Sequence, residues 1–210
     1  MKTFRLFLLA GLLTLTATGV YAADTKTQDQ AAPQAGAAGS ADKAAMMEKM
    51  KKLMSPSDAH KVLEPLAGKW TYTAKFWMDP SGKPEETTGS SENELIYGGR
   101  FLKQTVKGTW MGEPFEGAGY TGYDNIRQQY ESIWMDSMST SMMTSTGAYD
   151  AATKTLTQSG SCSCPLTGEK NRQVRSELLI TDKDHNTYSS FMSGPDGKEF
   201  KAMEIVYTRA

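Results

Sequence analysis

The sequence has 210 residues, of which 39% are hydrophobic and 22% charged, and its formal net charge is −1 at pH 7. Because the charge is near neutral and no lysine and arginine stripe is present, the composition argues against nucleic-acid binding and against a polybasic membrane patch.

The N-terminus has the pattern of an export signal. Lys2 and Arg5 precede an apolar stretch over residues 6–20, which falls short of the roughly 20 residues that a membrane-spanning helix needs. We therefore predict a signal peptide over residues 1–22, cleaved after Ala22. The mature chain would have 210 − 22 = 188 residues, no membrane span, and a periplasmic or secreted location.

Two segments of different character follow the signal. Residues 23–41 lack aromatic side chains and apolar periodicity, which predicts a disordered tether. Residues 42–54 are rich in helix formers and predict an amphipathic helix. Its apolar face comprises Met46, Met47, Met50, Leu53 and Met54. We favour packing on the following domain, or fraying, over a partner-binding or membrane-surface role, because so short a helix is marginal alone.

Residues 55–210 have the pattern of an all-β domain. Ser55-Pro56-Ser57-Asp58 predicts the start of a short helix that ends near Pro65. From Gly68 onward, apolar residues alternate with polar ones, as in a half-buried strand. Nine turn signals then divide the domain into about ten strands with short connections. We predict a closed antiparallel up-and-down barrel, with an open sandwich as the alternative.

The start of the domain resembles a known superfamily. A short helix running into Gly68-Lys69-Trp70 is similar to the opening of the calycin, or lipocalin-like, barrels. That resemblance implies that Trp70 closes the base of the barrel under an arginine from a late strand, for which Arg209 is the candidate. Gly68, Trp70 and Arg209 are therefore expected to be structural.

Several motifs between residues 60 and 149 also resemble DUF1579, a bacterial family of unknown function. The matching pieces include Gly98-Gly99-Arg100-Phe101-Leu102, Pro114-Phe115-Glu116-Gly117, Gly122-Tyr123-Asp124-Asn125 and Trp134-Met135-Asp136-Ser137-Met138-Ser139-Thr140. The resemblance implies a barrel fold and brings no established activity.

Residues 134–143 contain four methionines. A hairpin turning at Met138-Ser139 would pair Trp134 with Met143 and Met135 with Met142, on opposite faces. Soft cations need several thioethers converging on one point. We therefore interpret these methionines as hydrophobic filling and predict no metal site here.

Polar residues share strand faces with apolar ones, which favours a wet or ligand-filled interior over a dry core. Ser132, Gln158 and Ser176 alternate in this way, and burying them without partners would cost about 1–3 kcal/mol each. The sequence therefore predicts a lumen that binds a small, partly apolar molecule. The predicted contacts are Arg100, Tyr123, Tyr130, Trp134 and Asp136. A buried pairing of Arg100 with Asp136 or Glu94 is the alternative for that arginine.

Cys162 and Cys164 fall on one face of a strand. Three interpretations remain: a strained, easily reduced disulfide, a pair of thiolates for a thiophilic metal, or structural cysteines that pair locally. Two sulfurs alone are too few ligands for a closed zinc site.

The sequence carries no recognisable catalytic motif, so we name no catalytic residue and no cofactor. Whether the protein is an enzyme is left open, with binding favoured. An enzyme using Asp136 or His60 as an acid or base is the second hypothesis. An interaction protein is the third hypothesis, with residues 42–54 and an exposed strand edge as its contact surfaces and a homodimer as one form of the assembly.

Overall fold

The protein is described here by a computed structural model that covers residues 36–164, 167–194 and 196–210. The predicted signal peptide (1–22) and residues 23–35 of the predicted tether lie outside these residues. By its internal contacts the chain divides into two units, Met1–Ala41 and Asp42–Ala210. Within the described parts of the chain, no helix combines the length and hydropathy of a membrane span.

The first helix is longer and more exposed than predicted. It is α1 (Gly36–Met54), which begins at Gly36 rather than at residue 42, so residues 36–41 are helical and not part of a disordered tether. Alanine, the strongest helix former, supplies three of these six residues (Ala37, Ala38 and Ala41). All side chains from residue 39 to 54 are exposed, so the expected packing on the domain is not observed.

The predicted short helix is present as two pieces, α2 (Asp58–Lys61) and the 3-10 helix η1 (Glu64–Leu66). The N-cap is Ser57 and not Ser55, because the Ser57 backbone N–H donates to Nδ1 of His60 at 3.0 Å. Pro65 lies in the first turn of η1, where its missing N–H costs no hydrogen bond.

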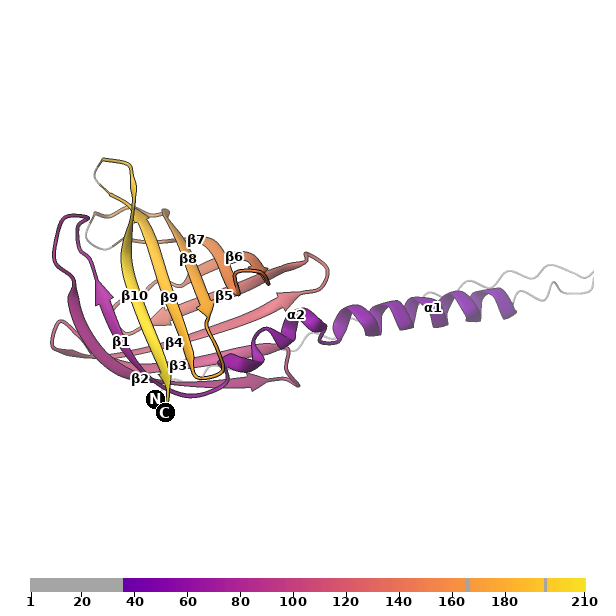
Figure 1. Cartoon of the computed structure of the whole chain (residues 1–210). Coiled ribbons are helices and arrows are strands. Elements are labelled where there is room, and N and C mark those ends of the chain that lie inside the picture. Colours follow the sequence, from indigo (N-terminus) through magenta and orange to yellow (C-terminus); the bar gives the residue numbers. More distant parts are fainter. Residues whose placement is uncertain (1–35, 165–166, 195) are drawn as a thin grey trace, which may run out of the picture. The chain divides into compact units, whose positions relative to one another are not determined.

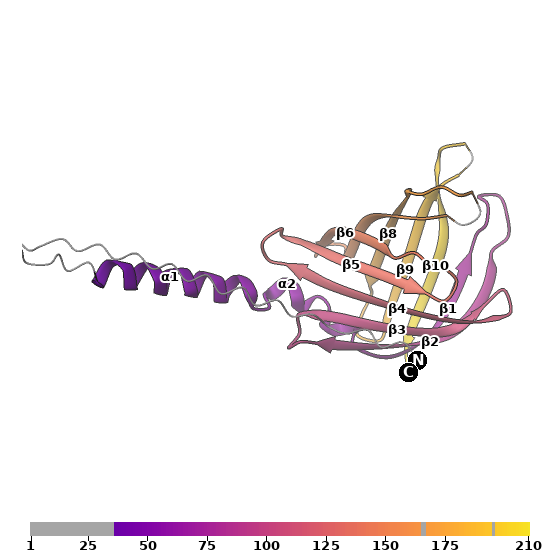
Figure 2. The same ribbon diagram turned by 180° about the vertical axis from the view of Figure 1, so that it is seen from behind.

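Ten strands follow, as predicted. They are β1 (Gly68–Phe76), β2 (Glu85–Ile96), β3 (Phe101–Trp110), β4 (Glu113–Asp124), β5 (Gln129–Asp136), β6 (Met143–Asp150), β7 (Thr155–Cys162), β8 (Arg172–Ile180), β9 (His185–Ser193) and β10 (Glu199–Arg209). Each strand pairs antiparallel with the next, and β1 pairs with β10, so the sheet closes into a barrel (Figures 1 and 2). The predicted closed up-and-down barrel is confirmed, and the sandwich is excluded.

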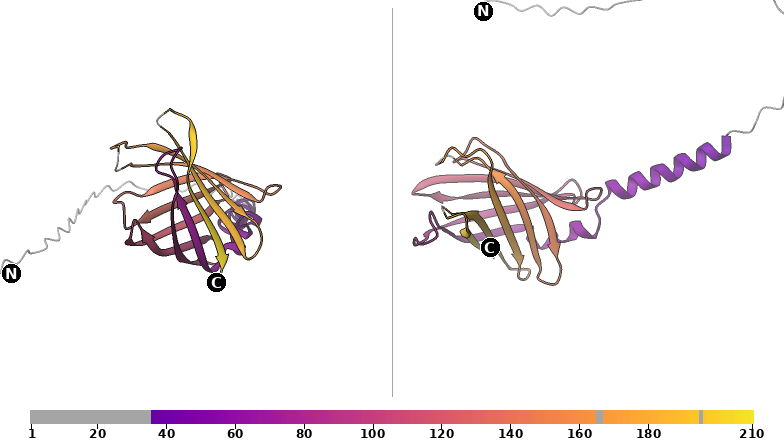
Figure 3. Two further views of the ribbon diagram at one scale, coloured as in Figure 1. Left: turned by 60° about the vertical axis from the view of Figure 1, so that its left-hand side comes forward. Right: turned by 90° about the horizontal axis from the view of Figure 1, so that it is seen from above.

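The two ends of the barrel differ. At one end, here called the base, β1 begins, β10 ends, and α2 and η1 lie against the strands. The other end, here called the mouth, carries the β1–β2, β3–β4, β5–β6, β7–β8 and β9–β10 connections. Figure 3 shows the barrel from two further sides. The helical segments therefore close only one of the two openings.

Strand alternation places side chains inside and outside as expected from a period of two. On β1, Trp70, Tyr72 and Ala74 are buried, whereas Thr71 and Thr73 are exposed. The predicted pairing of Trp134 with Met143 is also present.

Candidate functional site in the barrel interior

The base is closed around Trp70, which is 1% exposed. Its indole Nε1 donates to the Leu66 carbonyl at 2.9 Å, which ties β1 to η1. The guanidinium carbon of Arg209 lies 4.2 Å from the centre of the Trp70 ring, a cation–π arrangement. The same guanidinium donates to the carbonyls of Ala67 at 2.9 Å and Pro65 at 2.8 Å, so it also caps the helical segment.

Gly68 is required at the start of β1. Its φ is +125°, in the region that favours glycine, and a Cβ there would lie 2.4 Å from a guanidinium nitrogen of Arg209. A side chain at this position would displace the arginine from the base.

A cluster of aromatic and aliphatic side chains fills the barrel above the base. Leu63 is fully buried, and Tyr130 is 3% exposed and donates its hydroxyl to the Ala59 carbonyl at 2.7 Å. The Tyr123 ring makes edge contacts with the rings of Tyr130 at 4.9 Å and His60 at 5.8 Å. Burial raises the pKa of Tyr130 to about 12. This end of the interior is therefore packed.

The polar residues in the middle of the interior largely satisfy one another. Ser132 bonds Thr121 at 2.9 Å and accepts from the amide of Gln158 at 2.9 Å. The Gln158 side chain on β7 reaches Ser132 on β5 across the intervening strand β6, on which the register partner of Gln158 is Gly147. The expectation that such groups would lack partners in a closed interior is therefore wrong for these residues.

A second polar set joins β2 and β3. Ser91 donates to Asn93 at 2.7 Å, and Gln104 donates to Ser91 at 3.2 Å. Asn93 in turn donates to the Leu66 carbonyl at 2.9 Å, which connects this set to the base. Neighbouring strands thus supply the hydrogen bonds that sequence alternation alone does not show.

One buried hydroxyl is an exception. Among buried side-chain nitrogen and oxygen atoms of the described residues, Oγ of Ser190 alone has no hydrogen-bond partner. Ser190 is 2% exposed and lies on β9 between Ser176 of β8 and Met203 of β10. An unsatisfied buried hydroxyl costs about 1–3 kcal/mol, so it is a natural place for a bound polar atom.

Three tyrosines face the interior on β1, β9 and β10, and one of them, Tyr188, lies two residues from Ser190 on β9. Tyr72, Tyr207 and Tyr188 lie on β1, β10 and β9, and burial raises the pKa of each of them. Hydrogen bonds with Gln104 and Ser176 oppose the increase for Tyr207 and Tyr188, respectively. Their phenols are neutral at physiological pH and offer hydroxyl donors inside the barrel.

Toward the mouth, apolar side chains that face inward remain partly exposed. They include Phe76, Phe115, Trp134, Met143, Met192 and Ile205. Trp134 lies against the wall formed by β4, and its Nε1 donates to Asp136 at 2.8 Å. The other Asp136 oxygen accepts from the Met138 backbone N–H at 3.0 Å, which fixes the β5–β6 connection.

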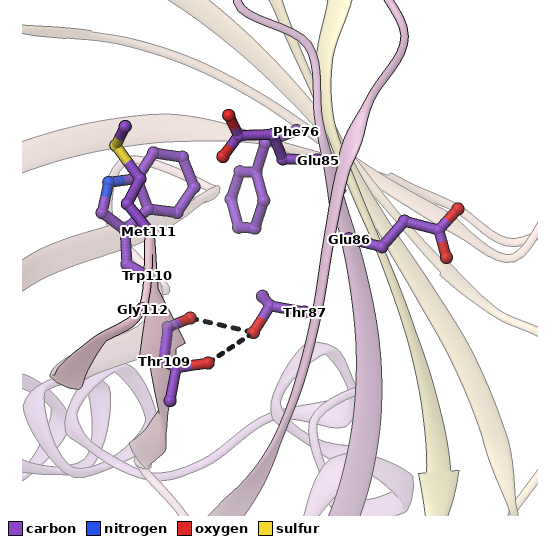
Figure 4. A pocket seen from close by; sticks show the side chains of 8 residues that line it. All are labelled: Phe76, Glu85, Glu86, Thr87, Thr109, Trp110, Met111 and Gly112. Carbon is purple, nitrogen blue, oxygen red and sulfur yellow. Dashed lines mark hydrogen bonds between the residues drawn. The ribbon is translucent and has the colours of Figure 1, made fainter.

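A cavity of about 120 Å³ lies at the rim of the mouth, between the ends of β1, β2 and β3 (Figure 4). Phe76 and Trp110 make an edge contact there, with ring centres 4.2 Å apart. Thr87 bonds the hydroxyl of Thr109 at 2.8 Å and donates to its carbonyl at 3.0 Å, which closes one side of the cavity. The lining is completed by Glu85, Glu86, Met111 and Gly112.

The comparisons with known proteins agree with this architecture. The family described as "Protein of unknown function (DUF1579)" matches residues 55–209. The chain belongs to the DUF1579 family. No curated protein matches it significantly. The crystal structure of Rv2717c from M. tuberculosis is similar to the DUF1579 barrel with a TM-score of 0.56 and 18% identity, over 74% of this chain and 99% of that chain.

A second solved structure shares the fold. The S-type phycobiliprotein lyase CPES from Guillardia theta has a TM-score of 0.50 and 10% identity, over 71% of this chain and 91% of that chain. At such identities the likeness shows only a shared barrel fold, and the chemistry of the DUF1579 barrel must be argued from its own residues.

The DUF1579 barrel does not bring the five predicted contact residues together. Trp134 and Asp136 face the mouth half of the interior, whereas Tyr123 and Tyr130 belong to the packed base. Arg100 lies in the β2–β3 turn, where its guanidinium donates to the carbonyls of Met54 and Tyr97.

Sequence reasoning missed Ser190 and the tyrosines Tyr72, Tyr188 and Tyr207 as interior polar groups of the DUF1579 barrel. Alternation did mark all four as inward-facing once the register was known. What it lacked was the residue register between β1, β10 and β9, which decides how far along the barrel each of these side chains lies.

Proposed function

We propose that this protein binds a small, partly apolar molecule in the mouth half of its barrel, without requiring catalysis. The observation that carries the proposal is the set of inward-facing apolar side chains, including Phe76, Phe115 and Trp134, that remain partly exposed at the uncovered end. Exposed apolar surface inside a concavity is stabilised when a ligand replaces water there.

The polar part of the ligand has a candidate partner in Ser190. Its hydroxyl is buried on β9, two residues from the partly exposed Met192, and lacks a partner. A molecule with an apolar body and one hydrogen-bonding end would cover the exposed apolar side chains and form a hydrogen bond with the Ser190 hydroxyl.

The expected contacts follow from the placement of the side chains. Trp134 offers an indole ring at the wall, and Asp136 orients that ring through its hydrogen bond. Tyr123 and Tyr130 would support the floor of the site rather than touch the ligand, and Arg100 would act by holding the C-terminal end of α1.

Titration with a hydrophobic fluorescent dye, together with native mass spectrometry of protein from its own host, tests the proposal. Trp134→Ala removes an aromatic wall and should weaken dye binding by about tenfold, the equivalent of about 1.4 kcal/mol. Met135→Ala is the matched control, because Met135 is the next residue on β5 and faces outward.

Two outcomes would contradict ligand binding. One is a protein that takes up no dye and carries no co-purified molecule. The other is equal dye affinity of the Trp134→Ala and Met135→Ala variants, since the dye would then sit elsewhere on the molecule.

We also propose that the protein is exported, on the basis of the apolar stretch behind Lys2 and Arg5. The intact mass of protein purified from its host tests this directly. Export with cleavage after Ala22 predicts a chain that starts at Ala23, and a chain that still carries residues 1–22 would contradict it.

A second candidate function is self-association through α1. Its apolar side chains are exposed by 36% to 66%, which is unusual for five neighbouring large apolar residues. They are Met46, Met47, Met50, Leu53 and Met54. A second copy of the same helix would present a matching apolar stripe in a two-fold arrangement.

A further inference from the structure

Sulfur-bearing side chains meet at the mouth on β6 and β7. Thr144 pairs with Ser161, so Met143 and Cys162, each one residue nearer the mouth, stand opposite each other. Met143 faces inward, because it is the register partner of Trp134. Cross-strand neighbours on one face have Cβ atoms about 4.5–5.5 Å apart. The register therefore assigns a thioether and a thiol to facing positions of neighbouring strands.

Cys164 joins the same group. Cys162, the last residue of β7, is partly buried, and Cys164, two residues beyond the end of that strand, is 8% exposed. Arg172, the register partner of Cys162, donates a hydrogen bond to Sγ of Cys164 at 3.4 Å. One guanidinium thus reaches from beside Cys162 to the sulfur of Cys164.

These three sulfurs match the preference of soft monovalent cations. Thiolate and thioether ligands select Cu(I) over harder ions, which prefer oxygen or nitrogen. Within the described residues, no group of three or more His, Cys, Asp or Glu side chains could hold a metal ion. A cation that accepts a methionine as its third ligand is therefore favoured over zinc.

We propose that Met143, Cys162 and Cys164 form a three-coordinate site for Cu(I), for which Ag(I) is a substitute of the same charge and softness. Binding forms two metal–thiolate bonds and one metal–thioether bond, and the two thiol protons pass to the solvent. The oxidation state of the metal does not change. The site adjoins the mouth half of the barrel, where Met143 is the register partner of Trp134, but it does not require the ligand proposed there.

The surrounding charges suit the complex that would form. One monovalent cation and two thiolates carry a net charge of −1, which the adjacent guanidinium of Arg172 offsets. Burial raises the pKa of the Cys162 thiol, Cys164 and Glu169 act in the same direction, and Arg172 lowers it. Because the metal must displace these protons, its affinity increases with pH.

The experiment uses the full mature chain, reduced and kept under anaerobic conditions, with Cu(I) supplied as the complex of a chromophoric chelator. The reduced protein should withdraw one Cu(I) per chain, with ultraviolet thiolate-to-copper charge-transfer absorption. Cys162→Ser and Cys164→Ser should each lower the affinity by more than the roughly 10- to 100-fold that a change outside the ligand shell costs.

A pair of methionine variants provides the decisive comparison. Met143→Leu should weaken Cu(I) binding by about tenfold, while Met142→Leu, at a neighbouring residue that is 62% exposed, should leave it unchanged. Leucine preserves the apolar volume, so both variants should fold even if the serine variants do not. Arg172→Gln should weaken binding by roughly 10-fold.

Several results would overturn the site. They are failure of the reduced protein to compete with the chelator, equal affinities of Met143→Leu and Met142→Leu, or binding without thiolate absorption. If the protein is purified with the two cysteines joined, the same titration after reduction gives the answer. A reduced chain that still leaves Cu(I) with the chelator excludes the proposal.

Discussion

At the residue scale, the position of Trp134 against β4 depends on two glycines of that strand that face its ring. A Cβ on Gly117 would lie 2.4 Å from the indole, and one on Gly119 would lie 2.9 Å from it. The ring can therefore lie flat on β4 only because these positions lack side chains. The hydrogen bond from Trp134 to Asp136 holds the ring in that plane.

Replacing Gly117 with alanine should thus disturb both the fold and the site. The added methyl group must displace the indole, at a cost of about 1–3 kcal/mol of unfolding free energy. Chemical denaturation and tryptophan fluorescence measure the two effects. Ala118→Ser, at the next residue and on the opposite face of β4, is the control. A Gly117→Ala protein with unchanged stability and emission would show that the indole does not rest on this wall.

Arg209 is the residue on which closure of the base depends most. Beyond its contact with Trp70, it donates to the carbonyls of Ala67, Pro65 and Lys183. Lysine keeps the positive charge but lacks the planar set of N–H donors with which the guanidinium bonds several carbonyls at once. Arg209→Lys should lower the unfolding free energy by about 2–4 kcal/mol.

The control for this substitution is Arg127→Lys. Arg127 is paired with Glu131 on the surface, and its side chain is 66% exposed, so its change should stay within about 1 kcal/mol. Similar losses for both variants in urea denaturation would mean that the base does not depend on the guanidinium geometry.

Individual residues were predictable from the sequence where strand parity alone decides their position. The inward orientation of Trp134 and Asp136 follows from alternation and is observed. Strand parity shows which face a side chain is on but not how far along the barrel it lies. From the sequence alone, Tyr130 of the packed base could therefore not be distinguished from Trp134 of the mouth as a ligand contact. Arg100 lies in a turn, where parity has no meaning, and its partner at Met54 belongs to a distant segment.

At the scale of elements, α2 carries a buried titratable side chain at the base of the barrel. His60 is 6% exposed, and its Nδ1 accepts from the backbone N–H of Ser57. Burial, and then the positive charge of Arg100, lower the pKa of His60 below its usual value. As pH falls below about 6.5, the unfolded chain takes up this proton more readily than the folded one.

His60 therefore contributes stability that is present above about pH 6.5 and is lost as the solution becomes more acidic. His60→Gln should flatten this part of the pH dependence, although it also removes part of the helix cap. Urea denaturation of both proteins at about pH 7.5 and about pH 5.5 measures the difference. Equal losses of stability between the two pH values in both proteins would contradict this role.

The number and order of the strands could be predicted because each connection is short and carries its own turn residues. Gly98-Gly99 and Pro195-Asp196-Gly197 are local signals that need no knowledge of the rest of the chain. Helix boundaries were less accurate. The cap at Ser57 depends on the ring of His60, and the start of α1 at Gly36 depends on an alanine-rich segment that composition alone assigned to the tether.

At the scale of the whole molecule, the barrel combines a dry, packed base with a mouth that leaves apolar surface uncovered. Sequence reasoning inferred a polar lumen from Ser132, Gln158 and Ser176, but Ser132 and Gln158 bond each other. Uneven closure, rather than polarity, is what now supports a binding site. The barrel is closed at one end only because α2 and η1 pack there, and the local sequence of these segments does not show where they pack.

The barrel should fold without α1. No side chain from residue 39 to 54 is buried, and the contacts at the C-terminal end of α1 run from Arg100 and Asn125 to backbone carbonyls that water can replace. A chain of residues 55–210 should therefore melt within about 3 °C of the mature protein in thermal denaturation. A much larger decrease in Tm would mean that α1 stabilises the barrel.

The proposed self-association through α1 makes the final prediction. The mature chain should sediment as a dimer and the 55–210 chain as a monomer, because only the former presents the apolar face of α1. Met50→Glu places a charge within that face and should raise the dissociation constant of the dimer by at least about tenfold. Ala44→Glu introduces the same charge on another side of the helix and should leave it intact. Sedimentation equilibrium distinguishes these cases, and a mature chain that is monomeric throughout would exclude the homodimer.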